Sequence, residues 1–171
     1  MILRLSQKMN MKVKGGNLAE LPLDANPFAD WSCHLFLAGR SQFIILMNTA
    51  SFYSCLMSER GITNQKTFLS RAREAICAYM AEDGQKLLFD KFIEPSFSTI
   101  RFAKPLNRSA IGSMNDLIHF AKYWIIDGLP EKEIGFRLNK VLLSALKDGN
   151  GRKYDYPKTA FLRLAERKIG L

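Results

Sequence analysis

The decapeptide NRSAIGSMND, residues 107–116, holds the residue types and spacing best suited to chemistry. It follows a segment with strand alternation and leads into an apolar helical pattern. Ser113 and Asp116 have the S-x-x-D spacing of a helix cap, and Ser109 is an alternative cap one turn earlier. Gly112 would permit a positive φ or a close backbone approach. The stretch therefore predicts a capped helix start.

The same helix start would also serve as an anion site. Uncapped N–H groups near Ser113, with the Arg108 guanidinium beside them, would hold a phosphate or a carboxylate. Asn107 and Asn115 would add flanking hydrogen bonds. The sequence lacks the spacing of a P-loop and that of a dinucleotide-binding loop, so no nucleotide-binding motif supports the anion site.

A second group of polar residues falls at the edges of the predicted strands. Its members are Arg4, Gln7, Lys8, Arg40, Asn48 and Tyr53. Some of them would face Arg108 if the hairpin packs beside the first strand, and the alternative is an ordinary surface or structural role. Arg4 interrupts an apolar strand, so it must lie either on the solvent face or against an acid.

The basic C-terminal segment is a third candidate. The chain carries a net charge of +9, which favours an acidic partner. Arg163, Arg167 and Lys168 could contact phosphates, and Tyr154 and Tyr156 could stack on bases. A solvated helix face is the alternative interpretation.

The cysteines and histidines give no recognisable catalytic or metal pattern. Cys33, Cys55 and Cys77 have apolar neighbours and no C-x-x-C spacing, which is typical of buried free thiols. His34 follows Cys33 directly, so on a strand the two side chains would face opposite sides. We therefore expect no metal and no cofactor, and the sequence favours a protein that is not an enzyme.

The order of elements predicts an α+β fold in one domain, residues 1–171. We expect a small antiparallel sheet containing a β-hairpin, helices packed on one face, and a helical C-terminal part. The expected elements are strands mainly in 1–60, helices in 66–95, a strand at 98–104 and helices in 109–171. The hairpin prediction rests on two apolar runs that flank AGRSQ.

The N-terminal residues lack the pattern of a signal peptide. The longest clean apolar run, FIILM, is far shorter than the roughly 20 residues that cross a bilayer. We therefore expect a soluble protein without membrane association, located in the cytoplasm.

Several longer motifs resemble a family of uncharacterised, mostly bacterial proteins of unknown function. The matching segments are MILRLSQK, LPLDANPFADW, LNRSAIGSMND and GFRLNKVLLSAL. The resemblance covers nearly the whole chain and implies one structural unit, but it implies no activity. It departs at PKTAF, where the family has PREAF.

Two functional hypotheses follow from these residues. The first is a non-enzymatic binding protein for nucleic acid or an acidic protein, which the basic composition motivates. The alternative is an enzyme or sensor that binds a phosphorylated or carboxylated small molecule at the Arg108 and Ser113 helix start. A homo-oligomer is a third possibility, through apolar hairpin surface.

Overall fold

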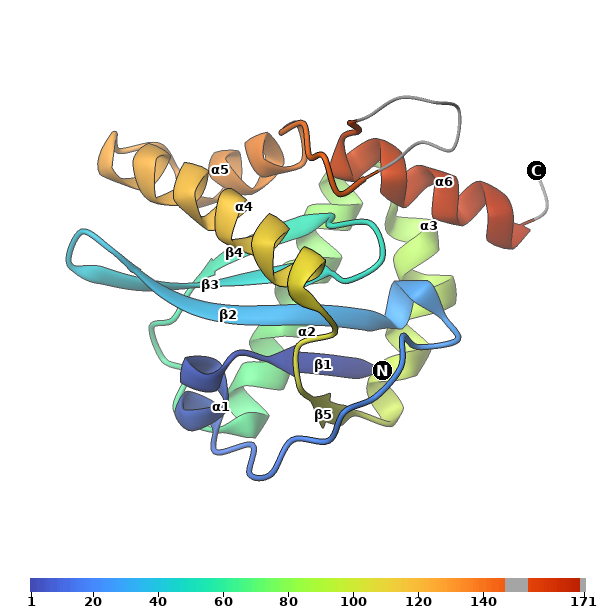
Figure 1. Ribbon diagram of the computed structural model, residues 1–171, viewed down its shortest axis with the longest axis horizontal. Coiled ribbons are helices and arrows are strands. Elements are labelled where there is room, and N and C mark those ends of the chain that lie inside the picture. The colour runs from blue at the N-terminus through green and yellow to red at the C-terminus, as the bar shows by residue number, and fades with distance from the viewer. Residues whose placement is uncertain (147–153, 170–171) are drawn as a thin grey trace.

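The computed structural model describes residues 1–146 and 154–169, which form one mixed β-sheet covered by helices (Figure 1). The strands are β1 (Ile2–Leu5), β2 (Asp30–Ala38), β3 (Ser41–Asn48), β4 (Ser54–Ser58) and β5 (Arg101–Ala103). The helices are α1 (Gln7–Val13), α2 (Gln65–Glu82), α3 (Lys86–Leu88), α4 (Arg108–Ile126), α5 (Glu131–Leu138) and α6 (Pro157–Ile169). Short helical turns cover Pro27–Ala29, Phe89–Ile93 and Glu94–Ser98. The predicted α+β class and helical C-terminal part are confirmed, while the parts of the 109–171 prediction at 147–153 and 170–171 lie outside the described residues.

The predicted β-hairpin is present as β2 and β3. Their register pairs Ala38 with Ser41, so Gly39 and Arg40 form the turn. Gly39 has a φ of 59°, the positive value that a type II′ turn requires at its first central position. The apolar run FIILM in β3 is buried from Ile44 to Met47, which is expected for a strand covered on both faces.

The sheet is mixed, whereas the sequence predicted an antiparallel one. Its strand order is β4-β3-β2-β1-β5, and β1 pairs in parallel with both β2 and β5. Parallel neighbours require a crossover connection, and α1 with the loop after it supplies the one between β1 and β2. The sequence did not predict the parallel pairing because the local residue pattern of a strand is the same whether its neighbour runs parallel or antiparallel.

Helices cover both faces of the sheet, which corrects the prediction of helices on one face. On the back of the sheet in Figure 1, α2 packs on side chains such as Leu3 and Cys33. On the front, α4 and α5 pack on Ile45, Met47 and Leu56. The alternation of side chains along each strand divides the core into these two clusters. The predicted single domain is not tested by this arrangement and stays a prediction.

Side chains from the helices cover the exposed edge of β4. The Asn139 amide accepts a hydrogen bond from the Ser54 N–H at 2.7 Å and donates one to the Ser54 carbonyl at 2.9 Å. The Tyr79 hydroxyl donates to the Leu56 carbonyl at 3.1 Å. These bonds satisfy backbone N–H and carbonyl groups of the edge strand that would otherwise be available to pair with another strand.

Candidate functional site

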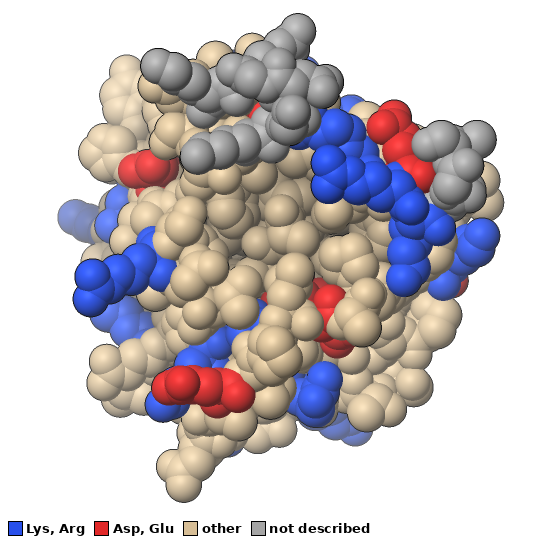
Figure 2. Space-filling view, turned by 45° about the vertical axis from the view of Figure 1, so that its right-hand side comes forward, with Lys and Arg blue, Asp and Glu red and all other residues tan. Residues whose placement is uncertain are grey.

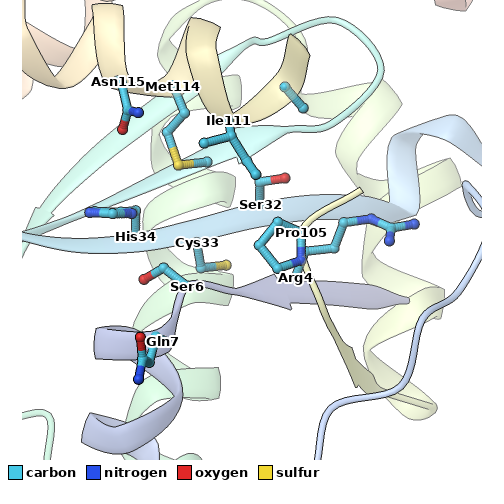
Figure 3. A pocket seen from close by; sticks show the side chains of 11 residues that line it. Arg4, Ser6, Gln7, Ser32, Cys33, His34, Pro105, Ile111, Met114 and Asn115 are labelled. Carbon is cyan, nitrogen blue, oxygen red and sulfur yellow. The ribbon is translucent and has the colours of Figure 1, made fainter. Parts of the chain in front are cut away.

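A cavity of about 170 Å³ lies on the front of the sheet, where α4 begins to cross it (Figure 3). Its floor comes from β1 and β2, and its other walls come from the start of α1, from Pro105 and from the first two turns of α4. The walls on the α4 side are apolar and include Ala110, Ile111 and Met114. The cavity lies beside the carboxyl ends of the parallel strands β1 and β5, the edge where open α/β sheets bind ligands.

The floor of the cavity is polar because β1 and β2 place polar residues on the front face. Ser32 and His34 are two apart on β2 and therefore share that face, while Cys33 between them packs in the back cluster. The Ser32 hydroxyl is 2.9 Å from the Thr49 hydroxyl, so it is already hydrogen-bonded. The remaining polar groups that reach the cavity are those of Arg4, Ser6, Gln7, His34 and Asn115.

Arg4 is a structural residue, fully committed to protein partners. Its Nε and one Nη donate to the two carboxylate oxygens of Asp30, each at 2.8 Å. The guanidinium also donates to the carbonyls of Leu21, Pro22 and Lys104 at 3.0, 2.8 and 3.3 Å. Since a guanidinium has five N–H donors, none is left for a ligand. Of the two alternatives for Arg4, the pairing with an acid is the one observed.

His34 is one of the cavity residues that sequence reasoning did not select as site residues. It is half-buried, and its side chain makes no hydrogen bond with any described residue. Burial lowers the pKa of its imidazole, and the positive charges of Lys8 and Lys122 lower this pKa further. The sequence offers one signal: His34 and Ser32 are two residues apart, so both side chains lie on the same face of a strand. This spacing indicates a site only once Arg4 is known to lie on that face of the sheet.

Cys33 does not contribute a reactive thiol to this site. Its side chain is buried among apolar residues on the other face of the sheet, as alternation along the strand predicted. Burial strongly raises the pKa of the thiol, so the nucleophilic thiolate is disfavoured.

The helix start differs from the predicted one. α4 begins at Arg108, and its N-cap is Asn107, whose side-chain oxygen accepts from the Ala110 N–H at 2.9 Å. Ser113 therefore lies inside the helix, on its buried face, and Asp116 is exposed one turn later. The predicted Ser113 cap is wrong because Ala110, Ser113, Met114 and Leu117 form one continuous buried face, which extends the helix toward Asn107.

The other predicted anion-site residues do not meet in the cavity. Arg108 and Gly112 are exposed on α4, and Arg40 is exposed at the tip of the hairpin. Asn48 is buried, and its amide donates to the Pro27 carbonyl at 2.8 Å and holds the turn after β3. From that set the structure brings only Arg4 and Asn115 to the cavity.

Two other members of the predicted polar cluster have different surroundings. Gln7 lines the cavity from the first residue of α1, and its side chain has no hydrogen-bond partner within residues 1–146 and 154–169. Tyr53 is buried in the back cluster, and its hydroxyl donates to an Asp83 carboxylate oxygen at 2.8 Å.

The C-terminal cations are partly neutralised by acids. The Arg163 guanidinium forms an ion pair with Asp155, and Lys158 pairs with Asp83 at 2.7 Å. Arg167 and Lys168 are exposed on the last turns of α6. On the face in Figure 2, Lys and Arg occupy separate groups around a broad area of other residues, so the cations seen there do not form one continuous stripe.

The described residues contain neither a recognisable metal site nor a membrane-spanning helix. No group of three or more His, Cys, Asp or Glu residues is arranged to hold a metal ion in this part of the chain. None of the helices described is long and apolar enough to span a membrane.

The fold and the site together define an α+β protein with a cavity of about 170 Å³ against the parallel half of a mixed sheet. The chain belongs to the family described as a domain of unknown function, DUF6933, whose model matches residues 2–160. The predicted membership in an uncharacterised family is thereby confirmed. No curated protein matches the chain.

Proposed function

We propose that this protein is a small-molecule binding domain whose ligand occupies the cavity between α4 and the β1–β2 floor. The single observation that carries the proposal is the cavity itself, which has apolar walls and several polar side chains along its lining. Such a combination is typical of ligand pockets, where apolar surface gives affinity and a few polar groups give orientation.

The polar groups at the cavity support a ligand rather than a purely structural role. Gln7, His34 and Asn115 approach it from three different elements, and their side chains have no hydrogen-bond partners among the described residues. In Figure 3, His34 and Asn115 lie at one end, while the Arg4 side chain runs toward the other. A ligand at the His34 end would therefore meet polar groups that are free to bind it.

The same geometry favours binding over covalent catalysis. The Cys33 thiol lies on the opposite face of the sheet, and the ion pair with Asp30 keeps the Arg4 guanidinium from stabilising a developing negative charge. In nucleophilic sites a third group, often a carboxylate, orients the imidazole that acts as the general base. His34 has no such carboxylate partner among the described residues. An acidic macromolecular partner has less support, because ion pairs neutralise Arg163 and Lys158 on α6.

A fragment titration tests the proposal. Benzene-sized fragments at millimolar concentration would be added to the full chain, with binding followed by amide chemical shifts and by the melting temperature. We expect hits that shift amides of β1, β2 and the first turns of α4. An engineered cavity of about 150 Å³ binds benzene, so a single ring is a suitable probe size.

A pair of tryptophan variants gives the control. Ile111→Trp places a large side chain at the cavity wall, whereas Ile126→Trp adds the same bulk at an exposed site at the end of α4. We expect hits to weaken by about tenfold or more in the first variant, because filling a pocket removes its ligand contacts. Hits that bind both variants equally, or a complete lack of hits, would refute the proposal.

A further inference from the structure

The cavity has neutral hydrogen-bonding groups at its mouth and apolar surface inside. Gln7 at the start of α1 and Asn115 of α4 line it and are exposed, and His34 of β2 is half-buried. Lining residues that are exposed mark the mouth, whereas Ala110 and Met114 are buried and line the inner part. The polar part of a ligand would therefore lie at the mouth, and its apolar part would lie inside.

The lining of the cavity offers no uncompensated charge to a ligand. Arg4 is the only permanently charged residue among the described residues that line it, and both carboxylate oxygens of Asp30 bind its guanidinium at 2.8 Å. Lys8 and Lys122 are exposed and do not belong to the lining, so solvent screens their charges. Burial, and to a smaller extent these two lysines, lowers the pKa of His34, which favours the neutral imidazole.

The unpaired groups at the mouth decide which chemical group of a ligand fits them. The side chains of Gln7 and Asn115 each present a carbonyl oxygen and an NH₂ group, and the neutral imidazole of His34 presents one donor and one acceptor. A carboxylate only accepts hydrogen bonds and an ammonium only donates them, so either would leave some of these groups unsatisfied. Either ion would also lose hydration without gaining a paired charge, which costs free energy. A neutral group that both donates and accepts is therefore the best match.

Building on the proposed function, we propose that the ligand is a small neutral molecule with a carboxamide, or another group that both donates and accepts hydrogen bonds, on an apolar body. The carboxamide lies at the mouth among Gln7, His34 and Asn115, and the apolar body packs against Met114 inside. The cavity volume of about 170 Å³ accommodates about one aromatic ring, since an engineered cavity of about 150 Å³ binds benzene.

Four probes that share a benzene ring test the polar group: benzamide, benzoate, benzylammonium and toluene. Each is titrated into the full chain at about pH 7.5, where a histidine of lowered pKa is neutral and both ionic probes keep their charge. Amide chemical shifts of β1, β2 and α4 are the readout. We expect benzamide to bind about tenfold or more tightly than either ion, because the cavity cannot compensate the hydration that a charge loses. Toluene is the reference for the ring alone.

Two sets of amide-to-leucine variants supply the control. Gln7→Leu with Asn115→Leu removes both side-chain amides from the mouth, and benzamide should weaken relative to toluene by about fivefold or more as its hydrogen bonds are lost. Gln42→Leu removes an exposed amide of β3 that does not line this cavity, and it should keep the ratio of the two affinities. Melting temperatures verify that both variants are folded.

The outcomes separate this inference from the proposed function. If benzoate or benzylammonium binds the cavity as tightly as benzamide, or if toluene alone binds, the inference is refuted and the binding function stands. The same holds if the double variant keeps the affinity ratio, or if Gln42→Leu lowers it equally. If all four probes leave the cavity amides unshifted, the proposed function fails and the inference fails with it.

Discussion

The Arg4 guanidinium of β1 and the Asp30 carboxylate of β2 form a bidentate ion pair, with both N–O distances at 2.8 Å. Both side chains are almost completely buried, and Arg4 also binds the carbonyls of Leu21 and Pro22. The pair therefore fastens the loop before β2 to the front of the sheet. Because Arg4 is held in this way, it supports the end of the cavity without being available to a ligand.

Breaking this pair should destabilise the fold strongly. Arg4→Met leaves the Asp30 carboxylate buried without its cation, and we expect a loss of roughly 3–5 kcal/mol in the free energy of unfolding. Urea denaturation monitored by tryptophan fluorescence measures it. The double variant with Asp30→Leu should lose much less than the sum of the two single losses. A loss below about 1 kcal/mol for Arg4→Met would contradict a buried, mutually dependent pair.

The position of the α4 cap is tested by alanine substitutions. Asn107→Ala removes the side-chain acceptor for the Ala110 N–H, and we expect a loss of about 1 kcal/mol in stability. Ser109→Ala is the matched control, since Ser109 is exposed in the first turn and its hydroxyl makes no hydrogen bond to another described residue. Thermal unfolding of both variants gives the comparison, and equal effects would argue against Asn107 as the cap.

Two helical glycines should respond to alanine with opposite signs. A Cβ atom at Gly135 would lie 2.3 Å from ring and hydroxyl atoms of Tyr79, whose hydroxyl bonds the edge of β4. We expect Gly135→Ala to destabilise the protein by about 1–3 kcal/mol through overpacking. Gly112 has open space around it, so Gly112→Ala should stabilise α4 by up to about 1 kcal/mol. Chemical denaturation of both variants decides, and stabilisation by Gly135→Ala would show that Tyr79 moves aside freely.

The titration of His34 predicts how stability depends on pH. Burial and the two lysines lower the pKa of the folded imidazole below its ordinary value of 6.5, so the unfolded chain binds a proton first as the pH falls. The contribution of His34 to stability is therefore complete above about pH 6.5 and is lost progressively below it. Urea midpoints measured between pH 5 and pH 8 should show this decline, and His34→Gln should reduce it. An unchanged slope in that variant would assign the decline to other groups.

Much of the local structure follows from the sequence, because local rules govern it. Gly39 between two apolar runs gives the hairpin, and the helical period through Phe68, Ala72, Ile76 and Met80 gives α2. The α+β class follows from the order of such segments. The cap of α4 was missed because Asn107 and Ser113 are both good caps, and the choice between them depends on which side chains the sheet buries.

The sequence by itself determined that Arg4 needs an unusual environment, that Cys33 and His34 face opposite sides of a strand, and that the chain belongs with an uncharacterised family. Only the tertiary structure decided that β1 lies parallel to β2 and β5, that helices cover both faces, and that Arg4 meets Asp30. The physical reason is that strand direction and long-range pairing depend on crossover connections and on shared burial, which leave no local signature. The cavity is a product of the same long-range packing, and so Gln7, His34 and Asn115 line one cavity only in the folded chain.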